Sequence, residues 1–175
     1  MKKTWMVLVA TLFGLGILAA RQAPPQAYPS IRNFLCEDVS FCTGGQPTLE
    51  DLEKLKAEGV KAIINLRQPT EYTAAAEAAK AKELGLRYFN IPVNGREPKD
   101  EQVEQFLKIA NDTKNRPLFI HCASANRVAA FWMIRRVLVE GWTVEKAEKE
   151  ATRIGLRTPV MRQFALGYIE RHQKK

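Results

Sequence analysis

A histidine, a cysteine and an arginine stand close together in the second half of this chain, at His121, Cys122 and Arg127. An apolar run ends at Ile120, and an apolar segment with helical character begins at Arg127. Between a strand and a helix N-terminus, unpaired backbone N–H groups and the helix dipole favour negative charge and so stabilise a cysteine thiolate. The spacing therefore predicts a nucleophilic thiolate at Cys122.

The residues between the cysteine and the arginine are small, and they are predicted to form an anion-binding loop. They are Ala123, Ser124, Ala125 and Asn126. Backbone N–H groups of a loop that curls can surround a tetrahedral anion, and the planar guanidinium of Arg127 can bind two of its oxygens. His121 is expected to orient this loop through a hydrogen bond. The expected partner is accordingly a small anionic substrate.

The elements around this loop are predicted from hydrophobic patterns and from helix caps. The predicted strands cover residues 31–36, 41–43, 60–66, 86–91 and 118–120, and helices are predicted near residues 48–58, 70–84, 103–110, 127–140, 143–151 and 158–168. Strands that alternate with helices from residue 48 onward indicate an α/β fold, with a mostly parallel central sheet flanked by helices on both faces. Ligands bind such sheets at the carboxyl ends of strands, where Arg67 and Cys122 both fall.

Composition limits the number of domains and the kinds of partner. The chain has 175 residues, 46% hydrophobic and 26% charged, which predicts one domain over residues 31–172, after a linker at 24–30 and before a tail at 173–175. The net charge is +8, but lysines alternate with glutamates, so nucleic acid is not expected as a partner. The only histidines are His121 and His172, so neither a metal nor a cofactor is expected.

Residues 1–23 have the pattern of a signal peptide or an N-terminal anchor, because two lysines precede an apolar run that ends near small residues. We therefore expect the domain to be exported to the periplasm or another extracytoplasmic space, with membrane contact only through an uncleaved leader. Cys36 and Cys42 flank a turn-like segment. They are either a disulfide pair in an oxidising compartment or two buried thiols.

Four segments in order resemble a known family. They are residues 44–48, 63–67 and 88–93, together with the His-Cys pair and its downstream arginine. These segments are similar to the protein tyrosine and dual-specificity phosphatases, and in particular to the phosphatase-like domain of beta-lactamase-hydrolase-like proteins. The resemblance covers residues 31–172 and implies a phosphatase-like fold in which Cys122 forms a phosphocysteine.

Several positions depart from the pattern of these phosphatases. The family places one more residue between cysteine and arginine than the four found here. Val128 stands where a serine or threonine usually assists hydrolysis of the phosphocysteine, and Asn94-Gly95 replaces the aspartic acid that protonates the leaving alkoxide. Glu97 and Asp100 are the nearest acids that could act instead. Ala125 stands where related short loops have glycine, and a positive φ there would strain an alanine.

The departures favour sulfur transfer over phosphate hydrolysis, because moving a sulfur atom from thiosulfate onto Cys122 needs no general acid. The loop is also as short as that of rhodanese sulfurtransferases. A phosphatase is the first alternative, and a non-catalytic anion or thiol sensor is the second. The candidates at the periphery of the site are Arg67, Gln46, Asn94, Glu97 and Asp100, and for Arg67 we favour a structural contact with Glu71 or Glu77.

Overall fold

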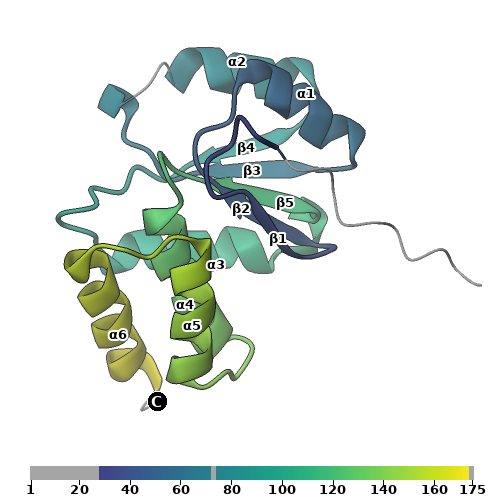
Figure 1. Cartoon of the computed structure of the whole chain (residues 1–175). Helices are drawn as coiled ribbons and strands as arrows, with labels where there is room; N and C mark the ends of the chain where they lie inside the picture. Colours follow the sequence, from purple (N-terminus) through teal and green to yellow (C-terminus); the bar gives the residue numbers. More distant parts are fainter. Residues whose placement is uncertain (1–27, 72–73, 174–175) are drawn as a thin grey trace, which may run out of the picture.

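The computed structural model describes residues 28–71 and 74–173, and these build a five-stranded sheet between two layers of helices (Figure 1). The strands are β1 (Leu35–Asp38), β2 (Phe41–Gly44), β3 (Ala62–Asn65), β4 (Arg87–Asn90) and β5 (Leu118–His121). They lie in the order β1-β2-β5-β3-β4. Only the β1–β2 pair is antiparallel. The predicted α/β class with a mostly parallel sheet is therefore confirmed.

Helices cover both faces of the sheet. Helices α1 (Leu49–Ala57) and α2 (Ala74–Glu83) lie on one face, and α3 (Asp100–Asn111), α4 (Asn126–Leu138), α5 (Val144–Ile154) and α6 (Pro159–Gln173) lie on the other (Figure 1). Two short 3₁₀ helices, η1 (Pro69–Glu71) and η2 (Thr113–Asn115), lie in connections. The first helix starts at the predicted cap, where Thr48 and Asp51 exchange side-chain to backbone hydrogen bonds of 3.1 and 2.8 Å.

Alternating strand residues supply two hydrophobic layers. Ile63 and Phe119 pack with the layer under α1 and α2, whereas Ile64 and Ile120 pack with the layer under the other four helices. Helix α4 runs through the larger layer and is buried almost all round, as its sequence predicts. This helix begins at Asn126, so the most deeply embedded helix of the domain carries the cysteine loop (residues 122–127) at its N-terminus.

Two predicted elements differ from those observed. The strand expected at residues 31–36 begins only at Leu35, because Asn33 has a φ of 55° and interrupts the extended backbone. The helix expected at residues 70–84 is also wrong at its start. Residues 69–71 form the separate turn η1, which opens with Pro69, and α2 starts at Ala74.

The N-terminal part of the chain lies mostly outside the described residues. The signal peptide or anchor predicted at residues 1–23 falls there, as does most of the predicted linker. Tyr28, which the sequence places in the linker, is already buried against the core, and the centroid of its ring lies 4.4 Å from that of Phe34. Within residues 28–71 and 74–173, no helix is both long and apolar enough to span a membrane.

Candidate active site

The cysteine loop connects β5 to α4 at the carboxyl end of the sheet. Cys122 follows the last residue of β5, and its backbone N–H donates to the carbonyl of Gly44 at 3.3 Å. Its side chain is buried and is the only cysteine outside a disulfide, because Cys36 and Cys42 are bonded across the β1–β2 pair. Cys122 is thus a free thiol with little contact with bulk water.

The carbonyl groups of the loop are bound by neighbours outside it. Ala123 O accepts from the Gln46 N–H at 3.5 Å, and Ser124 O accepts from Asn33 Nδ2 at 2.9 Å. Ala125 O accepts from the N–H of Ala129, within the first turn of α4, at 2.8 Å. In a trans peptide the N–H points opposite to the C=O, so the N–H groups that follow Ala123 and Ala125 point away from these partners. The loop therefore has the orientation that an anion-binding nest needs.

Ala125 takes the left-handed conformation, with φ 67° and ψ −1°. The resemblance indicated glycine at this place, and the structure shows why glycine suits it. A non-glycine residue in this region costs about 1 kcal/mol or more. With one residue fewer than the family pattern, the chain makes its turn into α4 at this alanine.

Arg127 is held by the hydrogen bonds that it donates to two other segments. Nη1 donates to Glu71 Oε1 at 2.6 Å and to Val93 O at 2.9 Å, and Nη2 donates to Glu71 Oε2 at 2.8 Å. These contacts use three of the five N–H groups of a guanidinium. The other two, on Nε and Nη2, share one edge and can hold two oxygens of a phosphate. Glu71 therefore orients Arg127 and leaves it a fork for substrate.

Glu71 is ionised. The hydrogen bond from Arg127 lowers its pKa to about 2, against the opposing effect of partial burial. Burial alone would lower the pKa of Arg127, but Glu71 and the Cys122 side chain together raise it. The Arg127–Glu71 pair thus carries both charges at any physiological pH, and Glu71 has no proton to give to a leaving group.

His121 is fully buried at the end of β5 and points to a second carboxylate. Its Nε2 lies 2.8 Å from Glu77 Oε1, and its ring stacks on Phe119 at 5.5 Å. Burial would raise the pKa of Glu77, but hydrogen bonds from His121 and Gln46 keep it below its ordinary value. His121 is therefore anchored to α2 at the end of the strand that Cys122 follows.

Arg67 and Gln46 lie beside the site and join its supports to one another. Arg67 Nη1 donates to Gln46 Oε1 at 2.7 Å, and Nη2 donates to the backbone carbonyl of Glu71. Gln46 Nε2 in turn donates to Glu77 Oε2 at 2.6 Å. Of the two partners that the sequence offered for Arg67, the structure places Glu71 against it.

Two of the other peripheral candidates, Asn94 and Glu97, lie on the connection between β4 and α3, and the third, Asp100, is the first residue of α3. Asn94 Oδ1 accepts from the backbone N–H of Arg96 at 3.0 Å. Glu97 is exposed, and Asp100 pairs with Arg171 of α6 at 2.9 Å. Neither acid has a contact with the cysteine loop among the described interactions.

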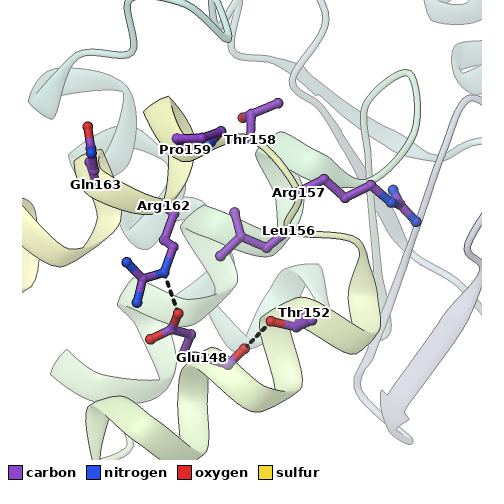
Figure 2. Close-up of a pocket in the computed structure, with 8 residues that line it drawn as sticks. All are labelled: Glu148, Thr152, Leu156, Arg157, Thr158, Pro159, Arg162 and Gln163. Atoms are coloured by element: carbon purple, nitrogen blue, oxygen red, sulfur yellow. Dashed lines mark hydrogen bonds and ion pairs between the residues drawn. The ribbon is translucent and has the colours of Figure 1, made fainter.

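Asn126, the residue before Arg127, binds the connection between α5 and α6. Its Oδ1 accepts from the N–H groups of Arg157 and Thr158 at 2.8 and 3.2 Å, and its Nδ2 donates to Thr158 Oγ1 at 2.9 Å. Beyond this connection lies a pocket of about 360 Å³ between α5 and α6, in which Glu148 pairs with Arg162 (Figure 2). The pocket contains no residue of the cysteine loop.

The sequence did not reveal several supports of the site. The sequence patterns indicate Glu71 and Glu77 only as partners for Arg67, and they place Asn33 in a strand. An asparagine between a bulky apolar run and a turn is a signal for the left-handed conformation, but its contact with Ser124 spans 91 residues of sequence and no local pattern encodes it. Among the described residues, no group of three or more His, Cys, Asp or Glu side chains could hold a metal ion.

A buried cysteine, a loop with outward carbonyls and an arginine at the head of the central helix, on this sheet, define a domain of the protein tyrosine phosphatase superfamily. Residues 32–160 match the family described as a DSP-PTPase phosphatase fused to NAD⁺ kinase, and the chain belongs to that family. The resemblance inferred from the sequence is confirmed.

Two related proteins are much longer than the segment that they share with this chain. NAD kinase 2 of Arabidopsis thaliana is 38% identical over 90 residues, which are 48% of this chain and 9% of that protein. The beta-lactamase hydrolase-like protein of Agrobacterium fabrum is 29% identical over 98 residues, 54% of this chain and 22% of that protein. The chain thus spans a small part of either relative.

Solved structures share the fold at low sequence identity. The core catalytic domain of the PP-IP phosphatase SIW14 from S. cerevisiae has a TM-score of 0.66 at 21% identity and covers 85% of this chain and 91% of that one. TpbA of P. aeruginosa, in complex with phosphotyrosine, has a TM-score of 0.64 at 19% identity. The match covers 82% of this chain and 86% of that one.

These matches favour the phosphatase alternative over the sulfur transfer that the short loop suggested. The physical reason lies at Ala125, whose left-handed conformation closes the shorter loop without displacing Arg127 from the head of α4. A loop with one residue fewer therefore does not by itself require another chemistry.

Proposed function

We propose that this protein is a cysteine-dependent phosphatase in which Cys122 is the nucleophile. The observation that carries the proposal is the arrangement of Arg127. Glu71 and Val93 orient its guanidinium from one side, and the Nε and Nη2 edge remains for the substrate. A dianionic phosphate group fits between this edge and the N–H groups of the cysteine loop.

The reaction has two steps. The Cys122 thiolate attacks phosphorus, the bond from phosphorus to the leaving oxygen breaks, and a phosphocysteine forms. Water then attacks the phosphocysteine, loses a proton to solvent, and releases inorganic phosphate together with the thiolate. In both steps the charge on the phosphoryl oxygens is stabilised by Arg127 and the loop N–H groups.

The relatives support a substrate that carries a phosphate group. SIW14 is a PP-IP phosphatase, and TpbA was crystallised with phosphotyrosine. Phosphate hydrolysis is therefore the stronger proposal, and sulfur transfer from thiosulfate serves as its comparison.

Turnover by the purified domain tests the proposal. We expect hydrolysis of p-nitrophenyl phosphate that is lost in Cys122→Ser, and no thiocyanate from thiosulfate and cyanide. Thiocyanate formation without phosphate release would favour sulfur transfer. Binding of inorganic phosphate with neither turnover would favour an anion sensor.

We further propose that the domain works outside the cytoplasm. The bonded pair Cys36–Cys42 supports this, because disulfides persist in oxidising compartments. Fractionation of cells that express the full chain, with thiol labelling, should find an oxidised pair in the extracytoplasmic fraction. A reduced pair in the cytoplasm would contradict the proposal.

A further inference from the structure

All aspartates and glutamates of this sequence lie among the residues that the structure describes. Residues 1–27, 72–73 and 174–175, which the structure does not describe, contain no aspartate or glutamate in the sequence. Every aspartate and glutamate of this sequence therefore lies in the described part.

Two carboxyl groups lie next to the cysteine loop, and both are already bound. Glu71 holds Arg127 through two hydrogen bonds of 2.6 and 2.8 Å. Glu77 is buried and bonded to His121 and Gln46. These contacts hold the pKa of each group below its ordinary value, so both are carboxylates and neither supplies a proton.

Hydrogen bonds hold the connection between β4 and α3, and none of those among the described residues brings an acid to the cysteine loop. Pro92 O accepts from Gln102 Nε2 at 2.7 Å, and Val93 O accepts from Arg127. These two hydrogen bonds tie the start of the connection to α3 through Gln102 and to α4 through Arg127. Asp100, the first residue of α3, is bound to Arg171.

Gly95 lies on the same connection, two residues after Val93, and is also close to the Arg127 side chain. A Cβ atom built on Gly95 would lie 3.9 Å from the Cγ and Cδ atoms of Arg127, in ordinary contact. The chain thus passes beside the aliphatic part of the Arg127 side chain at a residue that has no side chain.

We propose that this site hydrolyses phosphate groups whose leaving oxygen departs as a stable anion, as in aryl phosphates and phosphoanhydrides, and discriminates against alkyl phosphates. The inference rests on the phosphatase function proposed above. When Cys122 attacks, the bond between phosphorus and the leaving oxygen breaks, and its electron pair stays on that oxygen. Solvent protonates the product after it has left, so the rate depends on how stable the anion is.

The dependence of kcat/KM on the leaving group measures this property. Substituted phenyl phosphates of increasing phenol pKa, pyrophosphate and an alkyl phosphate form the series. We expect a steep fall with rising leaving-group pKa. The kcat/KM for the alkyl ester should be roughly 10²–10⁴-fold below that of enzymes that have a general acid, because this factor is the usual contribution of a positioned acid. Hydrolysis of pyrophosphate or of the phenyl phosphates, with little turnover of the alkyl ester, would support the inference.

Variants distinguish a site without a general acid from one in which Glu97 or Asp100 acts as the acid. Glu97→Gln and Asp100→Asn should leave the whole series unchanged. Gly95→Asp should raise turnover of the poorest leaving groups and add a loss of rate at high pH, whereas its matched control Gly95→Asn should do neither.

Two results would overturn the inference. One is a shallow dependence on the leaving group. The other is a selective loss with poor leaving groups in Glu97→Gln or Asp100→Asn. In both cases p-nitrophenyl phosphate is still turned over, so the phosphatase function itself survives. Absence of all phosphate turnover would instead remove the phosphatase function, and the substrate class with it.

Discussion

Ala125 is the residue at which the short loop is strained. It is buried and has a φ of 67°, a conformation that favours glycine. Ala125→Gly should raise the free energy of unfolding by up to about 1 kcal/mol, because relief of strain exceeds the greater entropy of glycine in the unfolded chain. Thermal or denaturant unfolding measures the change.

The matched control is Ala123→Gly, in the same loop but without a positive φ. This substitution should destabilise the protein, because glycine there brings only its entropy cost. If both substitutions had the same sign, the strain assigned to Ala125 would be wrong.

Glu71 acts on the substrate through Arg127. Glu71→Gln replaces an acceptor pair by a group with only one acceptor oxygen, so the guanidinium loses its orientation. We expect kcat/KM for aryl phosphates to fall about tenfold to hundredfold, which corresponds to the loss of a charge-assisted hydrogen bond. Glu83→Gln removes a carboxylate of the same charge from the exposed end of α2 and should change nothing. Equal effects of the two variants would show that only net charge matters.

The β1–β2 hairpin supports the cysteine loop through hydrogen bonds to the loop carbonyls. Residues at its two open ends, Asn33 and Gln46, bind the carbonyls of Ser124 and Ala123. The disulfide Cys36–Cys42 joins the strands between these ends. Movement of one strand would therefore release a contact to the loop.

Replacement of both Cys36 and Cys42 by alanine should lower stability and activity together. In the chain-entropy model a disulfide that closes so short a loop contributes about 2 kcal/mol. We expect a lower melting temperature, and at temperatures where the variant remains folded we expect a lower kcat for aryl phosphates. Treatment of the native protein with a reductant should reproduce both effects, but should not alter the variant. Full kcat in the folded variant would contradict the support role.

Local patterns were sufficient for most elements. The Thr48–Asp51 cap and the apolar face of residues 103–110 predicted two helices, and the short apolar runs predicted the strands of the sheet. Residues 31–34 could not be predicted, because Asn33 takes its conformation beside a carbonyl 91 residues away. The same holds for the Arg127–Glu71 pair, which spans 56 residues. The cysteine and its loop were found by spacing, but the residues that orient them were decided by tertiary contacts.

A buried acid pair connects β1 to the helices on the far side of the fold from α1 and α2. Glu150 accepts from Trp132 Nε1 at 2.9 Å and from Arg136 Nε at 2.7 Å, and Glu37 pairs with Arg153 at 2.9 Å. Burial and the neighbouring Glu150 raise the pKa of Glu37 from 4.5 to about 8, despite Arg153 and Arg136. The pair therefore holds a proton at neutral pH.

This proton makes stability depend on pH. Because the pKa of Glu37 is raised on folding, its contribution is fully present below about pH 4.5 and is lost as the pH rises through about 8. The loss over this window should be on the order of a few kcal/mol at most. Glu37→Gln should flatten the profile of unfolding free energy against pH, whereas Glu148→Gln, at the exposed ion pair with Arg162, should keep the slope. An unchanged slope in Glu37→Gln would refute the assignment.

The chemical identity of the group on Cys122 during turnover tests the phosphatase function most directly. Val128, buried where the related enzymes have a hydroxyl, should slow hydrolysis of the intermediate and let it accumulate. After rapid acid quench of the reaction with p-nitrophenyl phosphate, we expect mass spectrometry to find a phosphoryl group on the Cys122 peptide, and none in Cys122→Ser. After exposure to thiosulfate, the peptide should be unmodified. A peptide that gains a sulfur atom from thiosulfate and never a phosphoryl group would contradict a phosphatase.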